Sequence, residues 1–127
     1  MKASDLVNVW GAPDNTHLTA KQSSFRLPVH VAAKISALCD LYPNKTRTQI
    51  VGDLLSAALM DVEKALPSYQ GPACHGMVDD QGVELFFAVG PAAQFRERTN
   101  HHYKELEKEL GVENPTPFYE SDLLWSE

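Results

Sequence analysis

Residues 21–67 read KQSSFRLPVHVAAKISALCDLYPNKTRTQIVGDLLSAALMDVEKALP, and the order of patterns in this stretch decides the fold. A short run with alternating polar and apolar residues comes first and ends at Pro28. Two apolar patterns of helical period follow, separated by the turn at Pro43-Asn44-Lys45. The stretch therefore predicts one strand followed by two helices, within an α+β fold.

The alternating run, residues 22–27, predicts a strand with two different faces. Side chains alternate along a strand, so Phe25 and Leu27 share an apolar face while Gln22, Ser24 and Arg26 share a polar one. A proline at position 28 has no N–H group and a fixed φ, which ends a strand and suits the first turn of a helix. One face can bury apolar surface, and the other can make hydrogen bonds.

The first predicted helix is amphipathic. Val31, Ile35, Leu38 and Tyr42 recur at steps of four, three and four residues and so form one apolar stripe. Pro43 follows and stops the helix.

The second predicted helix begins at a capping box. Thr46 can accept a hydrogen bond from the backbone N–H of Gln49, whose side chain can reach back to the N–H of Thr46. The apolar stripe that follows is wide, as is typical of a helix covered by several neighbours. It consists of Ile50, Val51, Leu54, Leu55, Ala58, Leu59 and Val62, and the helix ends before Leu66-Pro67.

The strand at residues 22–27 has no partner nearby in residues 21–67. An isolated strand is unstable in water, and a second copy of the same chain is the simplest source of a partner. We therefore expect an obligate homodimer.

This order of strand, helix and capped helix resembles the ribbon-helix-helix family of DNA-binding proteins. The resemblance implies a dimer in which two strands pair as an antiparallel ribbon and four helices form the core, with the ribbon reading the major groove of double-stranded DNA. It implies base-reading roles for Gln22, Ser24 and Arg26, and phosphate-binding roles for Lys45, Thr46, Arg47 and Thr48. Ser24 is shorter than a typical base reader, and Asn44 stands where the family often has glycine.

The function that the resemblance implies is a homodimeric, sequence-specific transcriptional regulator or repressor. From the residues themselves we expect no catalytic residues, metal or cofactor. Arginine matches guanine O6/N7 and glutamine matches adenine N6/N7, which supports base reading. Two alternatives remain open: the polar strand face is only solvated, or the dimer is an antitoxin or adaptor that binds a protein partner.

The net charge is unevenly distributed along the chain. Residues 1–66 contain seven Lys/Arg and six Asp/Glu, a charge of +1, whereas residues 67–127 contain four and eleven, a charge of −7. A nearly neutral DNA-binding half predicts weak non-specific binding, and the acidic half is expected to face away from DNA.

Residues 1–20 are interpreted as an N-terminal arm. Leu6, Val9 and Trp10 have helical spacing before a Gly11-Ala12-Pro13 break, which favours a short docking helix, with a frayed arm as the alternative. No long apolar segment or leader pattern is present, so we expect a soluble, cytoplasmic protein with no membrane contact.

Residues 68–127 predict a second folded unit that could join dimers. Ser68 to Pro72 has the composition of a linker, and residues 74–89 predict a hairpin with its turn at residues 79–82. A helix is expected from Ala92 to Leu110, with Phe95, Tyr103, Leu106 and Leu110 on one side and Gly111 at its end. The aromatic, acidic tail from Pro117 to Glu127 could dock on its own protein or bind another one.

The cysteines and histidines give weak chemical signals. Cys39 and Cys74 do not make a disulfide framework and suit a reducing compartment. Cys74-His75 and His101-His102 could supply metal ligands, but adjacent histidines point about 100° apart on a helix. No nucleophile turn accompanies Cys74, so we expect neither a metal site nor an enzyme.

Overall fold

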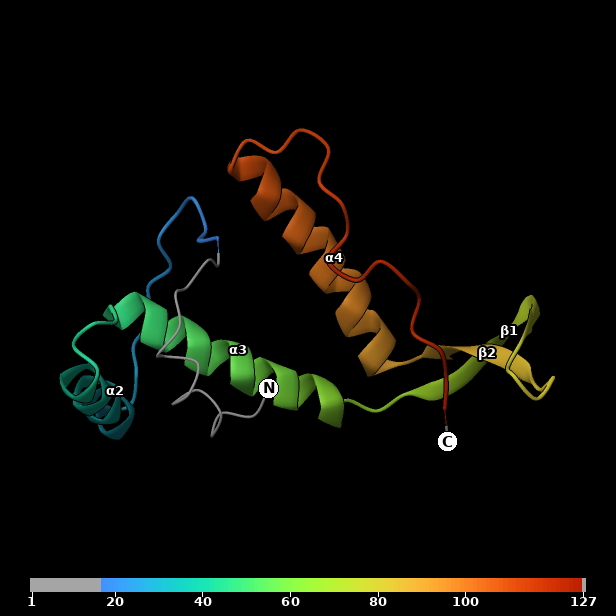
Figure 1. The fold of residues 1–127 in the computed structure, drawn as a ribbon, viewed down its shortest axis with the longest axis horizontal. Coiled ribbons are helices and arrows are strands. Elements are labelled where there is room, and N and C mark those ends of the chain that lie inside the picture. Colours follow the sequence, from blue (N-terminus) through green and yellow to red (C-terminus); the bar gives the residue numbers. More distant parts are fainter. Residues whose placement is uncertain (1–16, 127) are drawn as a thin grey trace. The chain divides into compact units, whose positions relative to one another are not determined.

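The computed structural model describes residues 17–126, which form two compact units within residues 1–62 and 63–127 (Figure 1). The described elements are α2 (Val29–Leu41), α3 (Arg47–Ala65), β1 (Tyr69–Val78), β2 (Glu84–Val89) and α4 (Pro91–Glu109). These three helices and one antiparallel two-stranded sheet confirm the α+β class. The helix predicted around Leu6, Val9 and Trp10 lies outside the described residues.

Helix α2 begins as predicted, directly after Pro28. This proline has φ −54° and ψ 144°, and its carbonyl oxygen accepts the N–H groups of Val31 and Ala32 at 3.0 and 3.1 Å. Proline is favourable here because the first helical turn does not need its missing N–H. Ile35 is the buried residue of α2, and Leu38 and Tyr42 of the predicted stripe pack against the core residues of α3.

The core of the first unit is small. Two fully buried residues on α3, Ile50 and Ala57, form its centre. The half-buried residues that pack against them are Leu38, Cys39, Tyr42 and Leu54. Much of the remaining apolar surface of α3 is open to solvent in the single chain.

The predicted hairpin turn is confirmed, and Asp79 organises it. Its carboxylate oxygen Oδ1 accepts the N–H groups of Gln81 and Val83, both at 2.9 Å. Its backbone N–H donates to the carbonyl of Val83 at 2.9 Å, and Gly82 supplies the left-handed residue at φ 80°. Aspartate commonly closes turns in this way because its short side chain reaches backbone donors nearby.

The interpretation of Ser68 to Pro72 as a linker was wrong, because β1 already begins at Tyr69. Tyr69 pairs with Val89 of β2, and the register is irregular on either side of Ala73. Gly71 lies so close to β2 that a Cβ there would be 2.8 Å from a backbone oxygen. Glycine and proline in a strand are typical of such irregular edge positions, which explains why the composition suggested a linker.

Helix α4 matches the predicted helix closely. Gly90 precedes it at φ 99°, Pro91 occupies its first turn, and Gly111 follows its end at φ 93°. A proline at the start and a left-handed glycine after the end are the usual helix boundaries. The helix packs on β2, and the second unit buries Cys74, Ala88 and Ala92.

The strap, residues 117–125, returns along α4 to the outer edge of β2. Phe87 and Leu124 form an antiparallel bridge, flanked by hydrogen bonds from Ala88 N–H to Leu123 O and from Trp125 N–H to Phe86 O, both 2.9 Å. Of the two alternatives for the tail, docking on its own protein is therefore the one that the structure shows. Within residues 17–126, no helix has the length and apolar character needed to cross a bilayer.

Candidate nucleic-acid interface

The expected base-reading residues, Gln22, Ser24 and Arg26, are all exposed. They lie on a segment that is not hydrogen-bonded as a strand in the single chain. The apolar face predicted for this segment is also open, because Phe25 is 79% exposed and Leu27 is 48% exposed. Within residues 17–126 the run at 22–27 pairs with no other strand, and its apolar side chains are only partly covered, so the strand remains a prediction.

The predicted capping box at the start of α3 is confirmed at both of its hydrogen bonds. The Thr46 hydroxyl oxygen accepts the N–H of Gln49 at 3.1 Å, and Gln49 Oε1 accepts the N–H of Thr46 at 2.9 Å. The first turn of a helix has N–H groups without acceptors inside the helix. The capping box uses two of them, so those of Arg47 and Thr48 remain available to an anion at the positive end of the helix dipole.

The side chains expected to bind phosphate surround this helix start. Thr46, Arg47 and Thr48 are exposed, and Lys45 is half-buried. The guanidinium of Arg47 donates to Ser36 Oγ of α2 at 3.3 Å, which ties the two helices together next to the candidate anion site. An exposed hydrogen bond of this length is weak, so Arg47 can turn toward a phosphate at small cost.

The turn between α2 and α3 does not need a left-handed residue at Asn44, the position where the ribbon-helix-helix family often has glycine. Among the described residues, every positive φ belongs to a glycine, so Asn44 has a negative φ. The N–H of Lys45 donates to the carbonyl of Tyr42 at 3.1 Å and closes the turn. The absence of the family's glycine therefore does not strain this turn.

One side of α3 presents an open apolar face in the first unit. Leu55 is 53% exposed, Leu59 is 54% exposed and Val62 is 52% exposed. Their spacing of four and three residues places them on one side of the helix. These residues were predicted to be covered by several neighbours, and in the single chain they are not. Burying such a face requires another apolar surface.

The cysteines and histidines do not form a centre in the described part of the chain. Residues 17–126 contain no group of three or more His, Cys, Asp or Glu side chains placed to bind a metal. Cys74 is buried, whereas His75, His101 and His102 are exposed. The rings of His101 and His102 meet edge to face at 5.2 Å, which is contact between neighbours on a helix.

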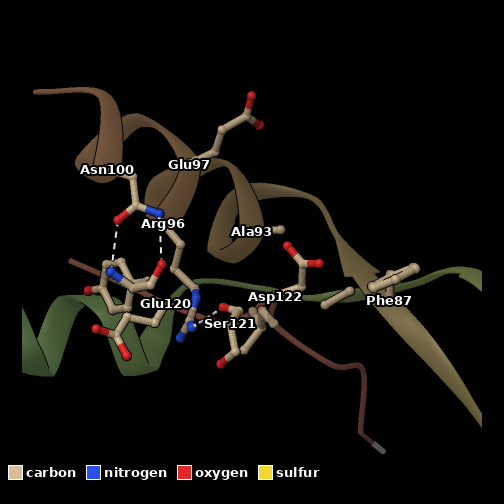
Figure 2. Close-up of a pocket in the computed structure, with 11 residues that line it drawn as sticks. Phe87, Ala93, Arg96, Glu97, Asn100, Glu120, Ser121 and Asp122 are labelled. Carbon is tan, nitrogen blue, oxygen red and sulfur yellow. Dashed lines mark hydrogen bonds between the residues drawn. The ribbon is translucent and has the colours of Figure 1, made fainter. Parts of the chain in front are cut away.

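Sequence reasoning missed a second cluster, which lies between α4 and the strap (Figure 2). Asn100 binds both backbone groups of Tyr119: its Oδ1 accepts the N–H at 2.8 Å, and its Nδ2 donates to the carbonyl at 3.0 Å. Arg96 donates to the carbonyl of Ser121 at 3.0 Å, and its guanidinium lies 4.2 Å from the centre of the Tyr119 ring. The one available signal was the spacing of Arg96 and Asn100, which puts two polar side chains on the same helix face.

The Tyr119 side chain provides a further anchor within the second unit. Its hydroxyl donates to the carboxylate of Glu63, near the end of α3. Burial, reinforced by this hydrogen bond and by the negative charge of Glu63, raises the pKa of Tyr119 to about 12, although Arg96 acts in the opposite direction. The phenol therefore keeps its proton, and remains a hydrogen-bond donor, throughout the neutral range.

Comparison of the chain with protein-family models, with curated proteins and with solved structures returns no match.

Proposed function

We propose that this protein is a homodimeric, sequence-specific DNA-binding transcriptional regulator that reads the major groove with a β-ribbon. The observation that carries the proposal is the combination, in one unit, of an unpaired exposed run at residues 22–27 and a capped helix start at Thr46. The ribbon-helix-helix arrangement and the DNA target rest on this combination and on the sequence resemblance described above.

The open surfaces of the first unit support the dimer. Phe25 and Leu27 are exposed on the run, and Leu55, Leu59 and Val62 are about half exposed on α3. Two copies related by a two-fold axis would pair the runs as an antiparallel ribbon and cover these apolar residues together. The free energy of burial would then come from surface that one chain leaves in water.

In the ribbon, the polar residues Gln22, Ser24 and Arg26 would face the DNA. A two-stranded ribbon fits the major groove, where arginine can bond guanine at two atoms and glutamine can bond adenine at two atoms. The N–H groups at the start of α3, with Arg47 and Thr48, would hold a phosphate and set the register of the ribbon. In this arrangement, the residues that recognise bases differ from the residues that position the protein on the DNA phosphates.

The test compares two arginine substitutions. Arg26→Ala is expected to reduce discrimination between the preferred site and random DNA by about 1–3 kcal/mol, because a base contact is lost. Arg47→Ala is expected to weaken binding to both DNAs equally, as loss of a phosphate contact does. Affinities are measured by fluorescence anisotropy at low salt, on a site selected from a random oligonucleotide pool.

Arg98→Ala is the matched control, because it removes the same charge from an exposed position on α4. It should leave both affinities unchanged. Equal loss on preferred and random DNA for Arg26→Ala would show that the ribbon does not read bases.

A second candidate function is supported by the charge of the C-terminal half. Residues 67–127 carry a charge of −7, which suits an antitoxin or adaptor that binds a basic protein partner. That function predicts no retention of DNA by the wild-type protein at low salt. The same anisotropy experiment therefore separates the two candidates.

A further inference from the structure

The strap is held mainly through its backbone. Asn100 binds the N–H and the carbonyl of Tyr119, and Arg96 binds the carbonyl of Ser121. Two more hydrogen bonds join the strap to β2, one accepted by Leu123 O and one donated by Trp125 N–H. An asparagine that bonds both groups of one peptide residue, beside a strand edge that bonds the next segment, is how proteins hold an extended peptide. The groove between α4 and the outer edge of β2 therefore has the chemistry of a peptide-binding site.

The strap covers this groove without filling it. Tyr119, Leu123 and Trp125 are half-buried, and no residue of the strap is fully buried. A pocket of about 410 Å³ remains between the strap and the elements beneath it. Figure 2 shows the strap beside Arg96 and Asn100, with Ala93 and Phe87 on the other walls of this pocket. Because the strap residues are at most half-buried, release of the strap exposes less apolar surface than opening a fully buried core would.

The segment between α4 and the strap can act as a hinge. Residues 110–114 are exposed, and Gly111 has φ 93° with no atom near the position of a Cβ. Fully extended, residues 110–116 span about 23 Å. A released strap can therefore reach the groove of an adjacent molecule without any change in α4 or in the hairpin.

We propose that the strap is exchanged between two copies of this chain, so that the strap of one copy lies in the α4/β2 groove of the other. The groove of a second copy offers the same asparagine, arginine and β2 edge, so an exchanged strap makes every hydrogen bond that it makes at home. The exchanged and the unexchanged strap differ only in the conformation of residues 110–116, and the exchanged form is favoured by a higher protein concentration. Exchange turns the C-terminal unit into a connector between copies, and it does not depend on DNA binding by the first unit.

The bridge between Phe87 and Leu124 provides the test. The hydrogen bonds flank this pair rather than joining it, and Cα atoms of such a pair lie about 4.5 Å apart, within the range of a disulfide. Full-length Phe87→Cys with one affinity tag is co-expressed with full-length Leu124→Cys carrying another, and the product is mildly oxidised. Linked peptides are then identified by mass spectrometry, so that native Cys39 and Cys74 can remain.

The expected result is a covalent dimer linked through positions 87 and 124. Phe87→Cys co-expressed with Val83→Cys is the matched control, because Val83 is exposed at the hairpin turn and away from the strap. An effective concentration of order millimolar for the exchanged pair, against chains at micromolar concentration, predicts roughly a thousandfold more 87–124 product than 87–83 product.

The double variant Phe87→Cys/Leu124→Cys in one chain shows whether the bridge itself exists. If this variant forms its disulfide within single chains while the co-expressed pair gives no 87–124 product, the exchange is overturned. Failure of both would also overturn it, because the strap would then not lie on β2. Dimer formation from the co-expressed pair supports the proposal whether or not the protein binds DNA.

Discussion

Leu59→Ala tests whether the open face of α3 is a dimer interface. Leu59 is 54% exposed in the single chain, so about half of its side chain remains to be buried. Full burial of a leucine contributes about 1.5–3 kcal/mol, so the remaining half contributes about 1 kcal/mol in each copy. A symmetric dimer contains the substitution twice, which makes the loss about 2 kcal/mol. We therefore expect the dimer dissociation constant to rise roughly 30-fold.

Sedimentation equilibrium over a concentration series measures this change, with a dimer at twice the 14.1 kDa chain mass as the reference state. Val83→Ala is the matched control, because Val83 is 57% exposed and lies outside the first unit. It should leave the dissociation constant unchanged. A monomeric wild-type protein, or an unchanged dissociation constant for Leu59→Ala, would refute the assignment of this face to the dimer.

Three further outcomes are expected. Thr46→Ala should lower the free energy of unfolding in urea by about 1 kcal/mol by removing the α3 cap, whereas Thr46→Ser should restore most of it. The raised pKa of Tyr119 means that its stabilisation is complete below pH 10 and is lost as the pH rises to about 12. The fluorescence of Trp125, in protein carrying Trp10→Phe, should change over this range, and Tyr119→Phe should abolish the change. Gly71→Ala should lower the thermal midpoint, because its Cβ would lie 2.8 Å from a backbone oxygen of β2.

The α+β class and most element boundaries could be predicted from the sequence because local interactions set them. The Thr46–Gln49 capping box and the Asp79 turn form between residues two to four positions apart. Pro28 and Gly111 act through their own backbone restrictions at helix ends. Both partners of each of these interactions lie within a few residues of each other, so a short stretch of sequence is enough to predict them.

The tertiary structure decided the features that join distant segments. The start of β1 at Tyr69 depends on pairing with Val89, and the glycine and proline that follow resemble a linker until that pairing is seen. Asn100 and Arg96 meet backbone groups 19 and 25 residues away, and their helical spacing does not reveal which segment returns to them. Residues 22–27 belong to a third case: within residues 17–126 they pair with no strand, and the strand proposed for them depends on a second copy rather than on the fold of one chain.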